Sequence, residues 1–448
     1  MTVRLATLRR RDPHDREILR LAVPALGALA AEPLYVLVDT AIVGRLGTEP
    51  LAGLAVAGIV LTSAFAIFNF LAYTTTGAVA RQVGAGDRRA AAEQGIDGTW
   101  LAAGLGVALT VLGLAVAPAV VSAMGASADV APHALTYLRI SLLGAPAMLV
   151  MLAGAGYLRG LQDTRTTLLV AVGSNVANLT VELVLVYGLD LGIAGSAWST
   201  VIAQVGGAAV YLGVLGRTAR AAGAATRPRA GGVRKAAVVG GQLVVRTAAL
   251  LAALLTATAV ASRIGDDAVA AHQIAFQVWI LLAMSLDALA IAGQAMVGRL
   301  LGAGDPAEAR AAARRMVELG LALGVTLGAG LALARPWLAP LFTEDPDVRH
   351  LALEVLWVVA ALQPLNAVVF VLDGVLIGAG DARYLAGAMV AAGIGVFVPL
   401  AVGVLELGGG LMALWAALCL LMVARLAGNA WRFAGGRWLV TGALAPGT

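Results

Sequence analysis

Ionisable side chains inside long apolar stretches are the residues of this 448-residue chain that could do chemistry. A charge at the centre of a bilayer costs about 3 kcal/mol, so a residue that carries one there is a candidate functional group. These candidates are Glu32, Asp39, Glu182, Arg246, Asp287 and Asp373. The four histidines are scattered along the sequence, so the clustered constellation that an enzyme would need is not expected.

The first half of the chain carries several oxygen-bearing side chains in one pattern. Asn175, Asn178 and Glu182 follow the spacing i, i+3, i+7, so they share one face of a helix. Together with Asp39 and Thr200 they would form a cluster suited to a proton relay or to Na⁺. Two carboxyl groups brought together at this depth favour holding a proton. The alternative is that these groups only bond neighbouring helices to one another.

The first apolar stretch has the features of a helix that bends. Pro24 removes a backbone hydrogen bond and permits a kink. Glu32 precedes Asp39 by seven residues, which predicts that both lie on one helix face, two turns apart. We interpret this stretch as a coupling element, a bendable helix with a buried carboxylate.

The second half carries a different polar set. Arg246 is predicted to form a buried ion pair with Asp287 or Asp373. The same three residues are the candidates there for a direct role in coupling or substrate contact. His272 is predicted to be a hydrogen-bonded residue near a helix start rather than a metal ligand.

The composition requires helices that cross a membrane. Hydrophobic residues make up 60% of the chain and charged residues 13%, and the mean hydropathy is +0.89. A span takes about 20 apolar residues, and lipid offers no partner to open backbone groups. An all-α integral membrane protein is therefore expected. Twelve spans are predicted, at residues 17–43, 51–80, 94–121, 132–158, 166–188, 193–215, 235–262, 268–298, 314–340, 350–377, 384–405 and 409–430.

A fixed offset of 218 residues relates the two halves. The sequence Gly-Ala-Gly-Asp ends at Asp87 and again at Asp305, and a related turn ends at Asp163 and at Asp381. Each half holds an even number of spans, so the two copies enter the membrane in the same direction, as a parallel repeat. We therefore predict two six-helix lobes. The expected domains are an N-lobe (1–216), a cytoplasmic linker (217–235) and a C-lobe (236–448).

The Gly-rich turns lack the residues of a phosphate-binding loop. They are predicted to be tight turns in which the aspartate caps the next helix. The charged segments that follow, residues 88–94 and 306–315, are expected to lie as helices on the cytoplasmic surface.

The distribution of Lys and Arg predicts the orientation. If both termini lie on one side, that side carries 25 basic residues and the other side four. By the positive-inside rule both termini are cytoplasmic. The net charge of +5 thus reflects topology and lipid headgroups, and it needs no nucleic-acid partner.

The stretch from Pro24 to Gly47, which ends in Val-Asp-Thr-Ala-Ile-Val-Gly-Arg-Leu-Gly, strongly resembles multidrug and toxic compound extrusion (MATE) transporters, specifically their DinF-type branch. The repeated turns and the pair Asn178 and Glu182 extend the resemblance over nearly the whole chain. The resemblance implies cation-coupled efflux and a V-shaped pair of lobes. The site it implies in the N-lobe comprises Asp39, Asn178, Glu182 and Thr200, with Pro24 and Tyr35 shaping the first helix.

Two departures from the family pattern bear on the coupling ion. The fifth-span acid is commonly Asp, and Glu182 is one methylene longer. The NorM-type branch has a C-lobe cation site with an acid on span seven and another on span ten. Here span seven has no acid and the span-ten position is Asn366, so sodium coupling through the C-lobe is not expected.

We predict a proton-coupled exporter of amphipathic or cationic compounds, located in the inner (plasma) membrane. The alternatives are a sodium-coupled antiporter that uses Asp39, Asn178, Glu182 and Thr200, a flippase for an amphiphilic lipid-linked substrate, and a passive channel. The expected partners are small substrates and the lipid bilayer. No cofactor is expected beyond the coupling ion, and the functional unit is predicted to be a monomer.

Overall fold

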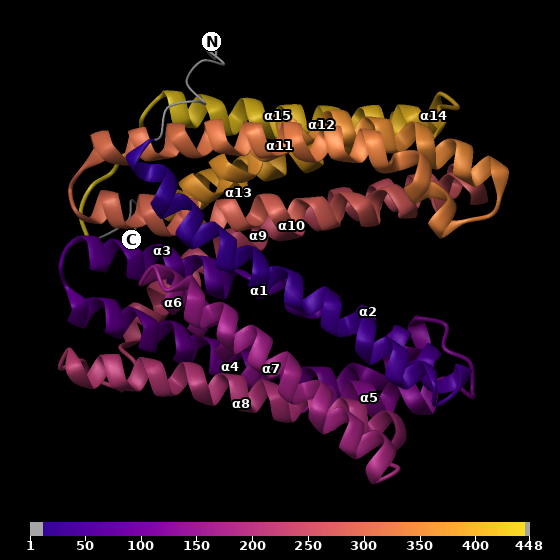
Figure 1. The fold of residues 1–448 in the computed structure, drawn as a ribbon, viewed down its shortest axis with the longest axis horizontal. Coiled ribbons are helices and arrows are strands. Elements are labelled where there is room, and N and C mark those ends of the chain that lie inside the picture. The colour runs from indigo at the N-terminus through magenta and orange to yellow at the C-terminus, as the bar shows by residue number, and fades with distance from the viewer. Residues whose placement is uncertain (1–11, 444–448) are drawn as a thin grey trace. The chain divides into compact units, whose positions relative to one another are not determined.

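The structure is a computed structural model that describes residues 12–443 (Figure 1). The regular elements of this part are helical throughout. The helices of the first half are α1 (Pro13–Gly44), α2 (Thr48–Ile67), α3 (Phe70–Gly84), α4 (Arg88–Ala123), α5 (Ala131–Leu143), α6 (Ala145–Gly160), α7 (Thr164–Leu183) and α8 (Gly192–Ala221). Those of the second half are α9 (Ala230–Ile264), α10 (Asp266–Gly302), α11 (Pro306–Phe342), α12 (Pro346–Gly378), α13 (Ala382–Val390), α14 (Val398–Glu406) and α15 (Leu411–Ala434). π-helical turns at Val184–Gly188 and Ala391–Phe397 follow α7 and α13.

Within the described residues, 11 helical segments are long and apolar enough to cross a membrane, and a bent pair brings the number to 12. The bent pair is α5 with α6, which meet at an angle of 50°. Pro146 lacks the N–H that would bond to the carbonyl of Leu142, and the hydroxyl of Thr110 donates to this carbonyl instead, at 2.6 Å. The predicted all-helical membrane fold is confirmed.

The two Gly-Ala-Gly-Asp turns have the predicted structure. Gly86 and Gly304 have φ angles of 79° and 80°, a conformation that L side chains rarely adopt. Asp87 and Asp305 each accept a hydrogen bond from the amide three residues on, at 2.8 and 2.9 Å. Each aspartate therefore caps the next helix.

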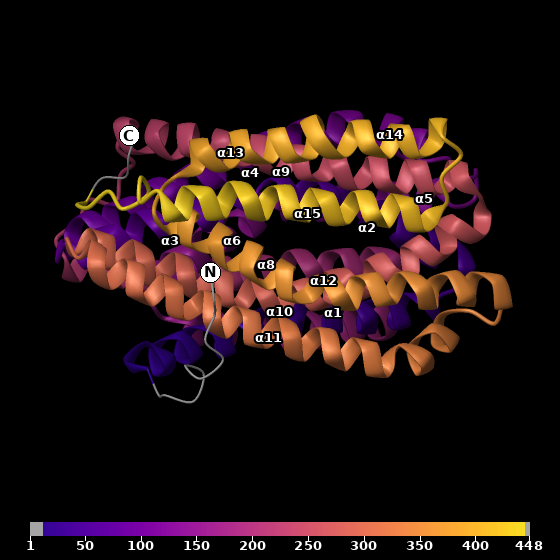
Figure 2. The same ribbon diagram turned by 90° about the horizontal axis from the view of Figure 1, so that it is seen from above.

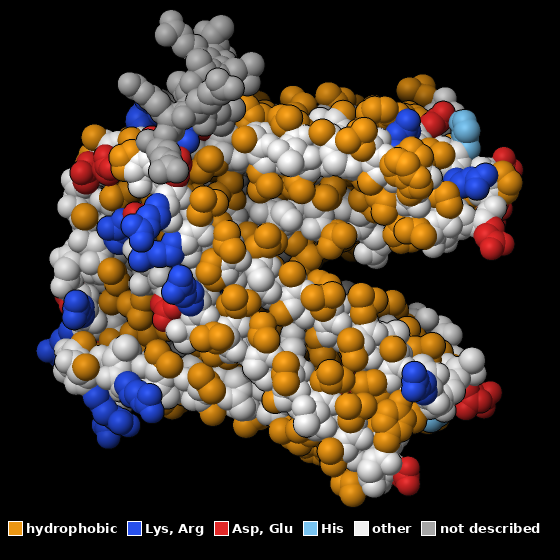
Figure 3. Space-filling view, viewed as in Figure 1, with side chains coloured by type: hydrophobic (Ala, Val, Ile, Leu, Met, Phe, Trp, Pro, Cys, Tyr) orange, Lys and Arg blue, Asp and Glu red, His pale blue; other side chains and the backbone are white. Residues whose placement is uncertain are grey.

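The charged segments after these turns do not form separate surface helices, so that expectation was wrong. They are the first turns of α4 and α11, and both helices continue from them into their apolar parts without a break. In Figure 3, Lys and Arg side chains gather mostly at the end of the helices that carries these turns. The charged residues thus extend the spans beyond their apolar segments.

The chain forms two compact units whose bounds differ from the expected domains. The first unit is Pro24–Gly240. The second unit runs from Gly241 onward and also includes the start of α1 up to Val23. Both divisions fall inside helices, α1 and α9. The segment between α8 and α9 is shorter than the predicted linker, because α8 ends at Ala221 and α9 begins at Ala230. The arginines of the charge count that precede residue 12 lie outside the described residues.

Ion pairs explain why the start of α1 belongs with the second half. Arg315 of α11 donates to both carboxylate oxygens of Asp15, at 2.7 and 2.9 Å. Arg299 of α10 donates to Glu17 at 2.8 Å. In the same unit, α15 packs beside α12 and α13 (Figure 2), and the apolar core lies mainly on α9, α10, α12 and α15.

A buried aspartate similarly fixes the segment before α9 to the first unit. Asp97 of α4 is 1% exposed, and it accepts three hydrogen bonds from Arg229, from the backbone N at 2.8 Å, Nε at 3.1 Å and Nη2 at 2.7 Å. Arg229 also pairs with Glu93. The unit boundary therefore lies beyond this segment, within α9.

Arg229→Gln should destabilise the first unit, because it leaves the buried carboxylate of Asp97 without its cation. The expected loss is about 2 kcal/mol, below the ~3–5 kcal/mol for a fully buried pair because the Arg229 side chain is 42% exposed. Thermal unfolding of the purified protein measures it. Arg234→Gln, which changes an exposed arginine near the start of α9, is the control, and equal midpoints for the two variants would contradict this role.

Candidate functional site

Asp39 lies buried on α1 with two hydroxyl donors. Its side chain is 4% exposed. Ser196 of α8 donates to Asp39 Oδ1 at 2.7 Å, and Tyr35, one turn earlier on α1, donates to the same oxygen at 3.4 Å. The second bond is long, so one good hydrogen bond compensates this group for its removal from water.

A row of polar contacts connects α1 to α7 through α8. The hydroxyl of Tyr35 lies 3.2 Å from Thr200 Oγ1. Asn178 Nδ2 donates to the same Thr200 oxygen at 3.4 Å. Thr200 itself donates to the carbonyl of Ser196 at 3.2 Å. These contacts place Asp39, Asn178 and Thr200 in one cluster.

Glu182 adds a second buried acid to the cluster. Its side chain has no exposed surface, and its charge interacts with that of Asp39. Within residues 12–443, neither Glu182 carboxyl oxygen has a hydrogen-bond partner, and Asn178 Oδ1 has none either. Buried acceptors outnumber donors here, which is costly unless something else satisfies them. A bound proton or a small cation would do so.

The other residues from the same sequence pattern have different surroundings. Asn175 Nδ2 donates to the backbone carbonyl of Ala31 at 2.9 Å, so this amide ties α7 to α1. Glu32 is exposed and does not share the burial of Asp39. Pro33 lies between the two acids and interrupts the backbone hydrogen bonds of α1. Pro24 is the first α1 residue of its unit.

Sequence reasoning missed two residues of the cluster. Ser196 precedes Thr200 by one helical turn, so the i, i+4 spacing of two hydroxyls on α8 was a signal that could have found it. Tyr137 of α5 is 7% exposed, and its hydroxyl interacts with Thr200 and Ser196. A tyrosine inside an apolar stretch gives little indication of where its hydroxyl lies.

The second unit holds a buried cluster in which the charges are compensated. Asp373 of α12 pairs with Arg246 of α9 at 2.5 Å and with Arg425 of α15 at 2.6 Å. Asn429 donates to its other oxygen at 2.7 Å. Asp287 is half-buried and interacts electrostatically with Arg425. Arg246 thus has an aspartate partner, as the sequence predicted.

Arg425 requires a correction. The charge count assigned it to the basic side of the membrane, yet its side chain is buried between α12 and α15, with 7% exposure. Its position near the end of the last apolar stretch suggested an interfacial arginine. The carboxylate of Asp373, one helix away, holds it inside instead.

His272 is also a hydrogen-bonded residue near a helix start. Its Nε2 lies 3.3 Å from Thr258 Oγ1, and its ring stacks on Phe276. No group of three His, Cys, Asp or Glu in the described chain could hold a metal ion. A sodium ion at the first cluster would therefore need the Asn178 and Thr200 oxygens beside the two carboxylates.

Two halves of membrane-spanning helices, whose sequences repeat at a fixed offset, are the usual plan of a membrane carrier. The MatE family model matches residues 24–184 and 243–402, which together make up most of the chain. The chain belongs to the multidrug and toxic compound extrusion (MATE) family of transporters, and it is not an enzyme.

Known relatives and structures extend this assignment. The chain is 34% identical to Protein DETOXIFICATION 44, chloroplastic, of Arabidopsis thaliana, over 93% of this chain and 81% of that protein. It is 28% identical to DNA damage-inducible protein F of Escherichia coli (strain K12), over 94% and 93%. A crystal structure of a MATE protein in complex with MaD3S superposes with a TM-score of 0.85 at 22% identity, covering 98% of this chain and 100% of that one. The predicted DinF-type branch is therefore supported by its homologues.

Ser196→Ala should impair transport by about tenfold, because Asp39 loses its one short hydrogen bond, and such a bond to a charged group contributes roughly 1.5–3 kcal/mol. Transport rates in proteoliposomes measure the effect. Ser199→Ala is the matched control, since Ser199 is equally buried on α8 but donates to the Ser196 carbonyl. Equal rates for the two variants would contradict a specific role for Ser196.

Proposed function

We propose that this transporter exports amphipathic and cationic compounds in exchange for protons, which bind at Asp39 and Glu182. The observation that carries the proposal is the complete burial of Glu182 next to a second acid, with no hydrogen-bond partner for its carboxyl oxygens within the described residues. Two such carboxyl groups cannot both stay charged at low cost, and one shared proton removes the repulsion.

Protonation of Asp39 provides the link to substrate release. When the carboxylate gains a proton from the outer side, its contacts with Ser196 and Tyr35 change, because a protonated acid donates as well as accepts. α1 then bends near Pro24, and the first unit (Pro24–Gly240) releases its substrate. The division between the compact units at Pro24 supports this bending point. Return of the site to the inner side delivers the proton.

Sodium coupling at the same cluster is the second candidate. Asn178 Oδ1 is a buried acceptor without a partner among the described residues, and an amide oxygen suits Na⁺ better than it suits a shared proton. The ligands would be Asp39, Asn178, Glu182 and Thr200.

In this proposal the buried charged cluster of the second unit stabilises the fold and does not bind the coupling ion. Asp373 pairs with both Arg246 and Arg425, and Asp287 interacts with Arg425, so Arg246 is already paired with an acid. Arg139 of α5 is exposed. The two arginines that could have favoured a flippase for pyrophosphate-linked substrates therefore lend that function little support.

The orientation with both termini in the cytoplasm, and the plasma membrane as the site of action, remain part of the proposal. They are supported by the strong bias of basic residues to one side. Membrane passage itself follows from the fold and the family.

Efflux of a fluorescent cationic dye from proteoliposomes, under an imposed pH gradient or an imposed sodium gradient, tests the proposal. Asp39→Asn and Glu182→Gln should each lower pH-driven efflux by at least about tenfold, because each removes a group that holds the proton. Glu32→Gln is the matched control, since it neutralises an exposed carboxylate on the same helix and should leave efflux unchanged. Efflux driven only by sodium would show that Na⁺, and not the proton, is the coupling ion. Normal pH-driven efflux by Asp39→Asn would refute the mechanism.

A further inference from the structure

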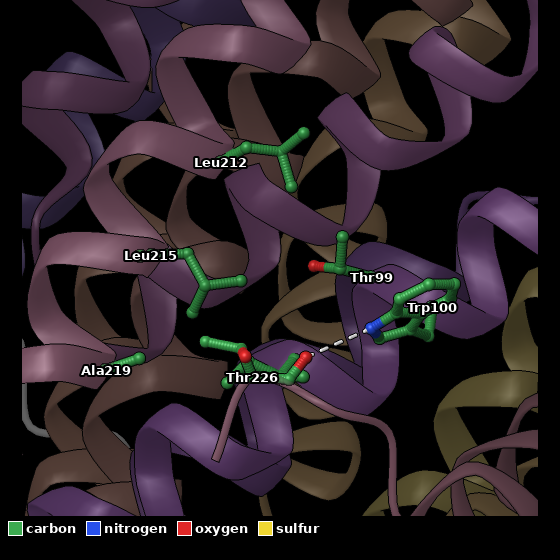
Figure 4. Close-up of a pocket in the computed structure, with 8 residues that line it drawn as sticks. Thr99, Trp100, Leu212, Leu215, Ala219 and Thr226 are labelled. Atoms are coloured by element: carbon green, nitrogen blue, oxygen red, sulfur yellow. Dashed lines mark hydrogen bonds between the residues drawn. The ribbon is translucent and has the colours of Figure 1, made fainter. Parts of the chain in front are cut away.

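A pocket of about 170 Å³ opens on the first unit between α4, α8 and the segment that joins α8 to α9 (Figure 4). None of its lining residues belongs to the cluster around Asp39. Trp100 of α4 forms one wall, and Leu212 and Leu215 of α8 form another. Thr226 closes one end, where its carbonyl accepts a hydrogen bond from the Trp100 indole at 3.3 Å.

The lining is suited to a hydrocarbon chain. It consists of aliphatic and aromatic surface, and its polar side chains are the hydroxyls of Thr99 and Thr226. Thr99 donates to the Gly95 carbonyl within its own helix, so its hydroxyl is already used. Trp100 and Leu212 are 54% and 47% exposed, which indicates that the pocket opens outward. An outward-facing apolar surface on a membrane-spanning helix faces lipid.

The pocket lies at the membrane interface. α4 begins at Arg88 and α8 ends at Ala221, so the pocket residues lie within a few turns of the charged end of both helices. Tryptophan collects at this depth because its indole has an apolar body and a polar N–H. Trp100 satisfies that N–H with the Thr226 carbonyl, which keeps the indole beside the pocket.

Two arginines that directly follow lining residues in the sequence have no ion-pair partner within the described chain. Arg220 follows the lining residue Ala219, and Arg227 follows Thr226, and both are exposed. Arg229, two residues further on, is by contrast paired with Asp97 and Glu93. Basic groups next to a hydrocarbon groove at the interface complement the headgroup of an anionic phospholipid.

We propose that this pocket binds an anionic phospholipid. One acyl chain lies between Trp100 and Leu212, and Arg220 and Arg227 contact the phosphate of the headgroup. The site is separate from the cation-coupling cluster, so the inference does not depend on the coupling ion.

Gly216 offers a direct way to fill the pocket. A Cβ at this position would meet open space, so Gly216→Leu places a side chain into the groove without a backbone clash. Gly206→Leu is the matched control, because Gly206 also faces open space on α8 but lies about 15 Å further along the helix. Both substitutions replace a helical glycine by the same good helix former.

Native mass spectrometry of the purified full-length protein, titrated with phosphatidylglycerol or with phosphatidylcholine, measures lipid retention. Wild type and Gly206→Leu should retain phosphatidylglycerol at least about tenfold more strongly than phosphatidylcholine, and Gly216→Leu should lose this preference. The double variant Arg220→Gln/Arg227→Gln should bind both lipids equally, since it removes the charge and leaves the groove. Thermal unfolding midpoints confirm that each variant is folded.

Either of two outcomes would overturn the proposal. Equal retention of the two lipids by wild type would show that the pocket does not select anionic headgroups. Unchanged phosphatidylglycerol retention by Gly216→Leu would show that the selective site lies elsewhere on the protein.

Discussion

The first unit depends on one constraint: two of its carboxyl groups are buried away from water and have too few hydrogen-bond donors. Asp39 has one short hydrogen bond, and Glu182 has none from the described residues. Such groups cost several kcal/mol when they are charged, and we propose that a proton or a cation in the cluster offsets this cost. In this proposal the helices that contribute to the cluster respond to the binding of that ion, as a transporter driven by an ion gradient requires.

The second unit also contains a buried acid, but there the charge is matched by neighbouring donors. Its buried acid, Asp373, accepts from Arg246, Arg425 and Asn429, so its charge is matched by neighbouring donors. A compensated cluster of this kind ties three helices together and gives no reason for an ion to bind. Among the described residues, the buried acids of the first unit thus have fewer donors than Asp373 of the second unit, and we propose that the two halves have different roles in the carrier.

The sequence predicted the parts of this account that follow from periodicity. Long apolar stretches gave the spans, a constant offset gave the repeat, and the i, i+4 spacing gave Asn178 and Glu182 on one face. Contacts between helices were harder to predict. Arg425 looked interfacial until Asp373 was found beside it, and Ser196 is a small residue that resembles ordinary helix packing. The exposure of Glu32 could not be predicted either, because helical periodicity cannot show which part of α1 is covered by its neighbours.

The central claim of the proposal is that Glu182 holds a proton because it is buried beside Asp39 with no donor among the described residues. Infrared difference spectroscopy of the purified protein, with and without an added cationic substrate, measures this directly through the carbonyl stretch of a protonated carboxylic acid. The account predicts such a band in the substrate-free protein, its loss when substrate binds, and its absence from Glu182→Gln. A band that persists unchanged in Glu182→Gln, or a protein that shows only ionised carboxylates, would contradict it.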